Sequence, residues 1–174
     1  VAAAARAGIP ADAPAKRMGL ITGLVGLENV KDADLVIEAV FETMAVKKEV
    51  FTALDKYAKK GAVLASNTSY LNIDEIASVT TRPQDVLGMH FFSPANVMKL
   101  CEIVRADKTA PDALVTAVSI ARKIAKVPAV VGVCDGFVGD GMLAQPGTHA
   151  DKLRFEGPGR RPVPPALSPA GSPR

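Results

Sequence analysis

The stretch ASNTSYLNIDEIASVTTRPQDVLGMHFFSPANVMKLCE, residues 65–102, decides how this chain folds. Three of its polar residues, Ser69, His90 and Glu102, lie in or just beyond short apolar segments that are typical of buried strands. The carboxyl ends of the strands are where ligands bind in an open parallel sheet. The stretch therefore predicts a site that includes a hydroxyl, an imidazole and a carboxylate at a sheet edge.

Apolar segments alternate with helical patterns from residue 34 onward, which predicts an α/β fold built on βαβ units. Strands are expected at residues 35–40, 63–66, 86–91, 100–104 and 128–133. Helices are expected at residues 43–60 and 112–126, together with a short helix capped by Asn72, with Glu75 as the acid of a capping box. The apolar face of the 112–126 helix is predicted to consist of Leu114, Val115, Val118, Ala121, Ile124 and Ala125. The third and fourth strands follow one another closely enough to be antiparallel neighbours.

Composition limits the class of protein. At 174 residues one domain with a sizeable core is expected. The net charge of +3, with both signs mixed, gives no reason to expect nucleic acid or a membrane as partner, and no apolar run reaches the roughly 20 residues of a membrane span. Cys101 and Cys134 lie in apolar segments, so both are expected to be reduced, buried thiols, which indicates a cytoplasmic protein.

The chemistry depends on the histidine and its neighbours. Histidine is the commonest proton shuttle near neutral pH, but a single histidine beside two phenylalanines is as readily a core residue. A carboxylate that orients an imidazole, with a hydroxyl beside the reacting group, is the usual arrangement of a general base. His90, Glu102 and Ser69 are therefore the candidate catalytic residues, and no metal site is predicted.

Several motifs carry a family resemblance when they are taken in order. They are DLVIEAVFE (34–42), VK (46–47), ASNTS (65–69), GMHFFSP (88–94), MKLCE (98–102) and DGFV (135–138). Together they resemble the NAD-binding domain of 3-hydroxyacyl-CoA dehydrogenases, as found in bacterial multifunctional β-oxidation enzymes. The resemblance implies the second half of a Rossmann-like, doubly wound sheet, with NAD as cofactor and a 3-hydroxyacyl-CoA as substrate, and full-length relatives that are oligomeric.

The resemblance also implies roles for individual residues. His90 is the general base, Glu102 orients it, and Ser69 hydrogen-bonds the substrate oxygen. The positions expected to contact NAD are Val40, Phe41, Glu42, Lys47, Ser69 and Ser93. The residues alone leave another interpretation of Glu42 and Lys47, as solvated charges at a helix entrance.

This chain departs from the family pattern at two site positions and at both ends. The family usually has Asn where Asp140 and Ser93 stand. Both changes are expected to reduce activity, and only the change at Asp140 is expected to abolish it. No Gly-x-Gly-x-x-Gly turn precedes Asp34, so the phosphate-binding half is expected to be missing. We therefore expect a poorly ordered or helical segment at 1–17, a partial NAD-binding domain at 18–156, and a disordered Pro, Gly and Arg-rich tail at 157–174.

Three functions are consistent with these residues. The first is NAD-dependent oxidation of a 3-hydroxyacyl-CoA. The second is a non-catalytic remnant that binds a partner or nothing at all. The third is a hydrolase that uses Ser69, His90 and Glu102, although Ser69 lacks the G-x-S-x-G motif of such enzymes.

Overall fold

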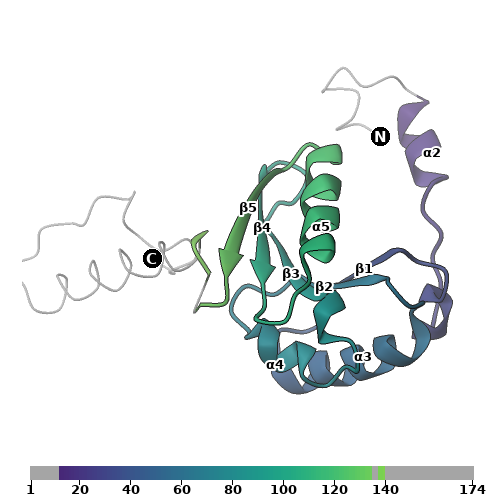
Figure 1. Cartoon of the computed structure of the whole chain (residues 1–174). Coiled ribbons are helices and arrows are strands. Elements are labelled where there is room, and N and C mark those ends of the chain that lie inside the picture. Colours follow the sequence, from purple (N-terminus) through teal and green to yellow (C-terminus); the bar gives the residue numbers. More distant parts are fainter. Residues whose placement is uncertain (1–11, 135–136, 140–174) are drawn as a thin grey trace, which may run out of the picture.

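The computed structural model describes residues 12–134 and 137–139 (Figure 1). Asp140 and the predicted tail at 157–174 lie outside these residues. Most of the predicted N-terminal segment at 1–17 also lies outside the described residues. Its described part consists largely of the helix α2 (Ala13–Met18). The predicted domain boundaries stay predictions.

The described residues form one five-stranded sheet in the order β1-β2-β3-β4-β5. The strands are β1 (Leu35–Glu38), β2 (Val63–Ser66), β3 (Val86–Phe91), β4 (Leu100–Arg105) and β5 (Val127–Gly132). Every neighbouring pair is parallel except β3 and β4, which are antiparallel, as their closeness in sequence suggested. The helices between them are α3 (Met44–Tyr57), α4 (Ile73–Ala77) and α5 (Pro111–Lys123), with short 3₁₀ helices at Leu27–Val30 and Pro83–Asp85.

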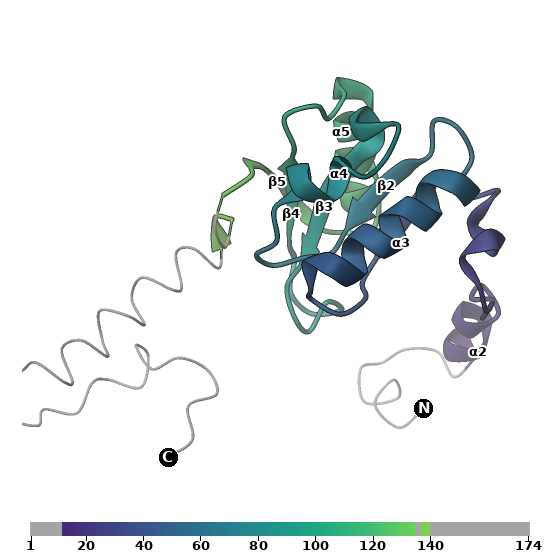
Figure 2. The same ribbon diagram turned by 90° about the horizontal axis from the view of Figure 1, so that it is seen from below.

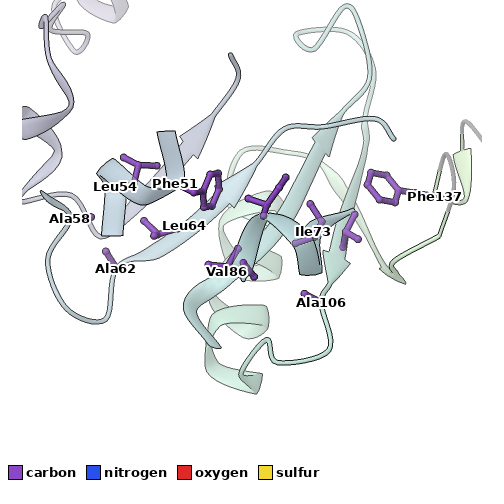
Figure 3. Close-up of a cluster of buried hydrophobic side chains, with 12 residues drawn as sticks. Phe51, Leu54, Ala58, Ala62, Leu64, Ile73, Val86, Ala106 and Phe137 are labelled. Atoms are coloured by element: carbon purple, nitrogen blue, oxygen red, sulfur yellow. The ribbon is translucent and has the colours of Figure 1, made fainter. Parts of the chain in front are cut away.

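Helices cover both faces of the sheet, so the predicted doubly wound α/β class is confirmed. Figure 1 shows α3 and α4 grouped together and α5 apart from them, and in Figure 2 α3 and α4 lie in front of the strands. One apolar cluster joins α3 and α4 to the sheet through Phe51, Leu54, Ile73 and Ile76 (Figure 3). The other joins α5 to Leu87, Met89 and Ile103 on the opposite face.

The alternation of side chains along β3 and β4 decides where the polar residues lie. Leu87 and Met89 pack with the α5 cluster, so Val86, Gly88 and His90 face the α3 and α4 side. Gly88 allows a close approach there, because a Cβ at this position would lie 2.8 Å from the Cβ of Val104. His90 and Glu102 therefore share one face with the larger cluster.

One predicted boundary, the end of the first strand, differs from the structure, and one, the start of the short helix at Asn72, agrees with it. The first strand ends at Glu38, not at Val40, because the Glu38 carboxylate accepts the N–H of Val40 at 2.6 Å and turns the chain out of the sheet. The predicted cap at Asn72 is confirmed, since its side chain accepts the N–H groups of Asp74 and Glu75 and begins α4. The role predicted for Glu75 in a capping box is not confirmed, because its carboxylate pairs with Lys48.

Two predictions of burial hold only in part. In α5, Ala121 is buried and Leu114 and Val118 pack against the core as predicted, but Val115 and Ile124 are exposed. The buried face of α5 consists of Ala113, Ala117 and Ala121, while Val115 is 65% exposed. Small side chains at i, i+4 spacing let the helix axis approach the sheet, whereas hydrophobicity alone favours the larger residues. Cys134 is exposed and Cys101 is buried, and both are free. None of the described helices has the length and apolar character needed to span a membrane.

Candidate functional site

The imidazole of His90 is held on its buried side by Glu102. The two residues are register partners across the antiparallel pair β3 and β4, and His90 Nδ1 lies 2.8 Å from Glu102 Oε2. Both side chains are almost fully buried. A carboxylate only accepts, so Nδ1 carries the proton, and in the neutral imidazole Nε2 has the lone pair.

The second oxygen of Glu102 is held by backbone beyond β5. Oε1 accepts the N–H groups of Val138 at 3.0 Å and Gly139 at 2.9 Å. The rings of Phe92 and Phe137 lie against the imidazole, with centroids 4.4 and 5.9 Å away. These two amide donors were not predicted from the sequence, because only folding brings them to a carboxylate more than 35 residues earlier.

Ser69 lies on the other side of the imidazole. Its Oγ is 3.1 Å from His90 Nε2, and it belongs to the segment that leaves the carboxyl end of β2. The structure thus brings together the three residues that the sequence singled out. The hydroxyl of Ser69 contacts Nε2 of His90, and Nδ1 of His90 contacts the carboxylate of Glu102.

Glu42 anchors the segment that carries Ser69. Its Oε1 accepts the N–H of Ser69 at 2.9 Å and the hydroxyl proton of Thr68 in a short contact. Its Oε2 lies 3.3 Å from the ammonium of Lys47. Partial burial raises the pKa of the Glu42 carboxyl, but the hydrogen bonds from Thr68 and Ser69 and the charge of Lys47 outweigh it, so that pKa lies below its usual value.

Lys47 is not a solvated charge. The side chain has no exposed surface, and its ammonium donates to both oxygens of Glu38, at 2.9 and 3.1 Å. Glu38 also accepts the hydroxyl proton of Ser66 at 2.7 Å. Glu38 was not singled out from the sequence. The feature that could have indicated it is a single acidic residue within the apolar run LVIEAV.

Three of the remaining predicted positions are exposed at the surface. Val40 is partly exposed, Phe41 is 84% exposed and Ser93 is exposed in the loop after β3. Asp140 lies outside the described residues. The predicted contacts of these positions with NAD stay predictions.

The contacts of Ser69, His90 and Glu102 also have the order of a hydrolase triad. A nucleophilic serine of that kind normally sits on a sharp, strained turn between strand and helix. Among the described residues, positive φ outside glycine occurs at Ala125 and Phe137 and not at Ser69. No cluster of three or more His, Cys, Asp or Glu suited to a metal ion occurs in this part of the chain either.

Comparisons with known proteins agree with the dehydrogenase interpretation. Residues 2–134 match the family described as "3-hydroxyacyl-CoA dehydrogenase, NAD binding domain". The chain is 49% identical to the peroxisomal bifunctional enzyme of Danio rerio over 135 residues, which is 74% of this chain and 19% of that protein. It is 40% identical to the fatty acid oxidation complex subunit alpha of Shewanella amazonensis over 142 residues, 82% of this chain and 20% of that protein.

A solved structure shares the fold as well. The (S)-3-hydroxybutyryl-CoA dehydrogenase of Ralstonia eutropha has a TM-score of 0.84 at 28% identity, over 88% of this chain and 54% of that one. This chain spans about a fifth of the length of the two curated relatives above.

Proposed function

This chain belongs to the family of the NAD-binding domain of 3-hydroxyacyl-CoA dehydrogenases, and on that premise we propose that it takes part in NAD-dependent oxidation of a 3-hydroxyacyl-CoA to a 3-ketoacyl-CoA. The observation that carries the proposal is the imidazole of His90, held at Nδ1 by Glu102 and in contact at Nε2 with Ser69. The Danio rerio and Shewanella amazonensis relatives, named as a bifunctional enzyme and a fatty acid oxidation subunit, support a role in fatty-acid β-oxidation.

The chain's own residues supply the proton chemistry. His90 Nε2 takes the proton of the substrate's C3 hydroxyl as that oxygen becomes a carbonyl. The carboxylate of Glu102 stabilises the imidazolium that forms, and the Ser69 hydroxyl holds the substrate oxygen next to Nε2. NAD, when bound, supplies the acceptor of the C3 hydride. The protein positions the groups and removes the proton.

The nicotinamide side of the cofactor is assigned to the surface around Glu42. Val40, Phe41 and Ser93 offer exposed apolar and hydroxyl contacts, and Lys47 holds Glu42 from beneath. Ser93 in place of the family's Asn reaches less far, so weaker cofactor binding is expected. We also propose that Asp140 lowers activity through its negative charge near the substrate.

Location and assembly are part of the proposal. A cytoplasmic setting is proposed for this chain, although the relatives include peroxisomal as well as bacterial proteins. An oligomeric full-length protein is likewise proposed from the family resemblance.

Ligand titration and turnover test the proposal together. The purified chain is titrated by calorimetry with NADH and with reduced nicotinamide mononucleotide, and oxidation of NADH is then followed with acetoacetyl-CoA. Binding of the mononucleotide reports the nicotinamide side alone. We expect both ligands to bind, and His90→Gln to lose turnover by about 10²–10⁴-fold while it keeps NADH binding.

Two other outcomes identify the alternatives. A folded chain that binds neither nucleotide is the non-catalytic remnant. A serine-trapping reagent that labels Ser69, together with turnover of a simple ester, indicates a hydrolase.

A further inference from the structure

Glu38 makes more hydrogen bonds than any role discussed so far requires. The side chain is 1% exposed and accepts four hydrogen bonds from three groups: one from the N–H of Val40, one at each oxygen from the ammonium of Lys47, and one from the hydroxyl of Ser66. It lies at the last position of β1, under the surface where Val40 and Glu42 emerge. A carboxylate that is removed from water to this degree is costly unless every lone pair is satisfied.

Lys47 lies between two carboxylates in different surroundings. Glu38 is buried, whereas the side chain of Glu42 is 40% exposed and lies 3.3 Å away. Because Glu38 binds the ammonium with both oxygens, it fixes Lys47 on the buried side, and Glu42 binds the same ammonium from the surface side. The position of the ammonium therefore sets the position of the Glu42 carboxylate.

Glu42 links the ammonium of Lys47 to Ser69 and His90. Its other oxygen holds the N–H of Ser69 and the hydroxyl of Thr68, and the Oγ of Ser69 contacts His90 Nε2. Contacts thus run without a break from Glu38 through Lys47 and Glu42 to Ser69. Buried ion pairs are seldom better for stability than apolar residues of the same size, so stability alone does not account for this pair.

We propose that Glu38 is a positioning residue, which acts through Lys47 and Glu42 to keep Ser69 in contact with His90 and to shape the nicotinamide side of the site. The role in cofactor binding rests on the proposed function. The role in placing Ser69 does not, because it concerns contacts within the chain.

The test replaces Glu38 with glutamine, which keeps the size and removes the charge. Without that charge the ammonium of Lys47 moves toward Glu42, which weakens the hold of Glu42 on Ser69. Nitrogen-15 NMR of the imidazoles measures the hydrogen bond at His90 Nε2 without any ligand, and His149→Gln assigns the signals of the two histidines. Calorimetry with NADH measures the cofactor site.

A matched control removes the charge of an exposed pair. Glu75 lies 3.4 Å from Lys48 with both side chains at least one third exposed. We expect Glu75→Gln to leave the His90 signal and the NADH affinity unchanged. Glu38→Gln is expected to shift the Nε2 signal and to weaken NADH binding about tenfold, which corresponds to one hydrogen bond to a charged group.

The double variant Glu38→Gln with Lys47→Met separates positioning from folding. It removes both buried charges, so it stays folded even if the single variant does not. Because Glu38 acts through Lys47, the double variant should match Lys47→Met alone in both readouts. Added effects of the two changes, or a Glu38→Gln protein that loses stability only and keeps a normal Nε2 signal, overturn the proposal. If the wild-type chain fails to bind NADH, the proposed function fails, while the Nε2 signal still decides the role of Glu38.

Discussion

Replacement of Glu102 by glutamine tests whether the hydrogen bonds of the buried carboxylate determine the state of His90. Glutamine has nearly the same shape, but it offers one acceptor oxygen and one NH₂ donor in place of two acceptors. The wild-type side chain accepts three bonds, from His90 Nδ1, Val138 N–H and Gly139 N–H, at 2.8, 3.0 and 2.9 Å. The amide group has two orientations, and neither reproduces all three.

The magnitudes decide which orientation forms. If the NH₂ group of glutamine faces Val138 and Gly139, two partly buried N–H donors lose their acceptor and face another donor instead, at about 1–3 kcal/mol each. If the oxygen faces them instead, three charge-assisted bonds become neutral ones, at a loss of about 1 kcal/mol each and about 3 kcal/mol in total. The NH₂ group then donates to His90 Nδ1, which must give up its proton. The second orientation costs less at the typical values, so the imidazole changes tautomer and Nε2 becomes a donor.

Two measurements follow from this reasoning. Urea unfolding should show a loss of about 3 kcal/mol, which at a slope of about 1.5 kcal/mol per molar lowers the midpoint by about 2 M. Nitrogen-15 NMR should show Nε2 protonated in the neutral imidazole, and any acetoacetyl-CoA reduction should fall by about 10²–10⁴-fold. An unchanged tautomer together with a midpoint within error of wild type would refute the reasoning. Glu75→Gln again controls for charge removal, since its carboxylate is exposed.

Three further predictions concern packing, reactivity and pH. Gly88→Ala should destabilise the fold by about 1–3 kcal/mol in urea unfolding, because the new Cβ meets that of Val104, and Val104→Ala should not relieve this contact since it retains its Cβ. Burial raises the pKa of the Cys101 thiol to about 11, so iodoacetamide should label exposed Cys134 at neutral pH and spare Cys101 until the chain unfolds. The pKa of Glu42 is lower in the folded chain than its usual 4.5, so the ionised carboxylate stabilises the fold above that pH. The difference in unfolding free energy between wild type and Glu42→Gln should therefore shrink as the pH falls below 4.5.

The strands and the central pair of the site could be predicted because the information is local. Short apolar segments bounded by Gly, Pro and polar residues give the strands, and the short connection between β3 and β4 suggests the antiparallel pairing. Once that pairing holds, the register places Glu102 directly opposite His90. The cap at Asn72 could also be predicted, because a capping side chain acts on residues only two and three positions further on.

The rest depends on contacts that no local pattern encodes. Burial of Lys47 requires Glu38 on β1, Glu42 before α3 and Ser66 on β2 to converge, and each alone resembles an ordinary polar residue. The face of α5 was predicted only in part, because alanine side chains allow close packing on the sheet, which hydrophobicity alone does not indicate.

The two sides of the imidazole are held by interactions of different kinds, and this difference can be measured. Glu102 is fixed by the backbone ladder of β3 and β4 and is shielded from solvent, so salt has little access to it. Ser69 depends on Glu42, whose exposed carboxylate is open to screening. Rising ionic strength should therefore weaken the Nε2 contact with Ser69 before it affects the Nδ1 contact with Glu102, and nitrogen-15 NMR over a salt titration resolves the two atoms. If both signals shift in parallel, the two contacts are coupled as one rigid unit, and Glu42 is not the weaker point of attachment.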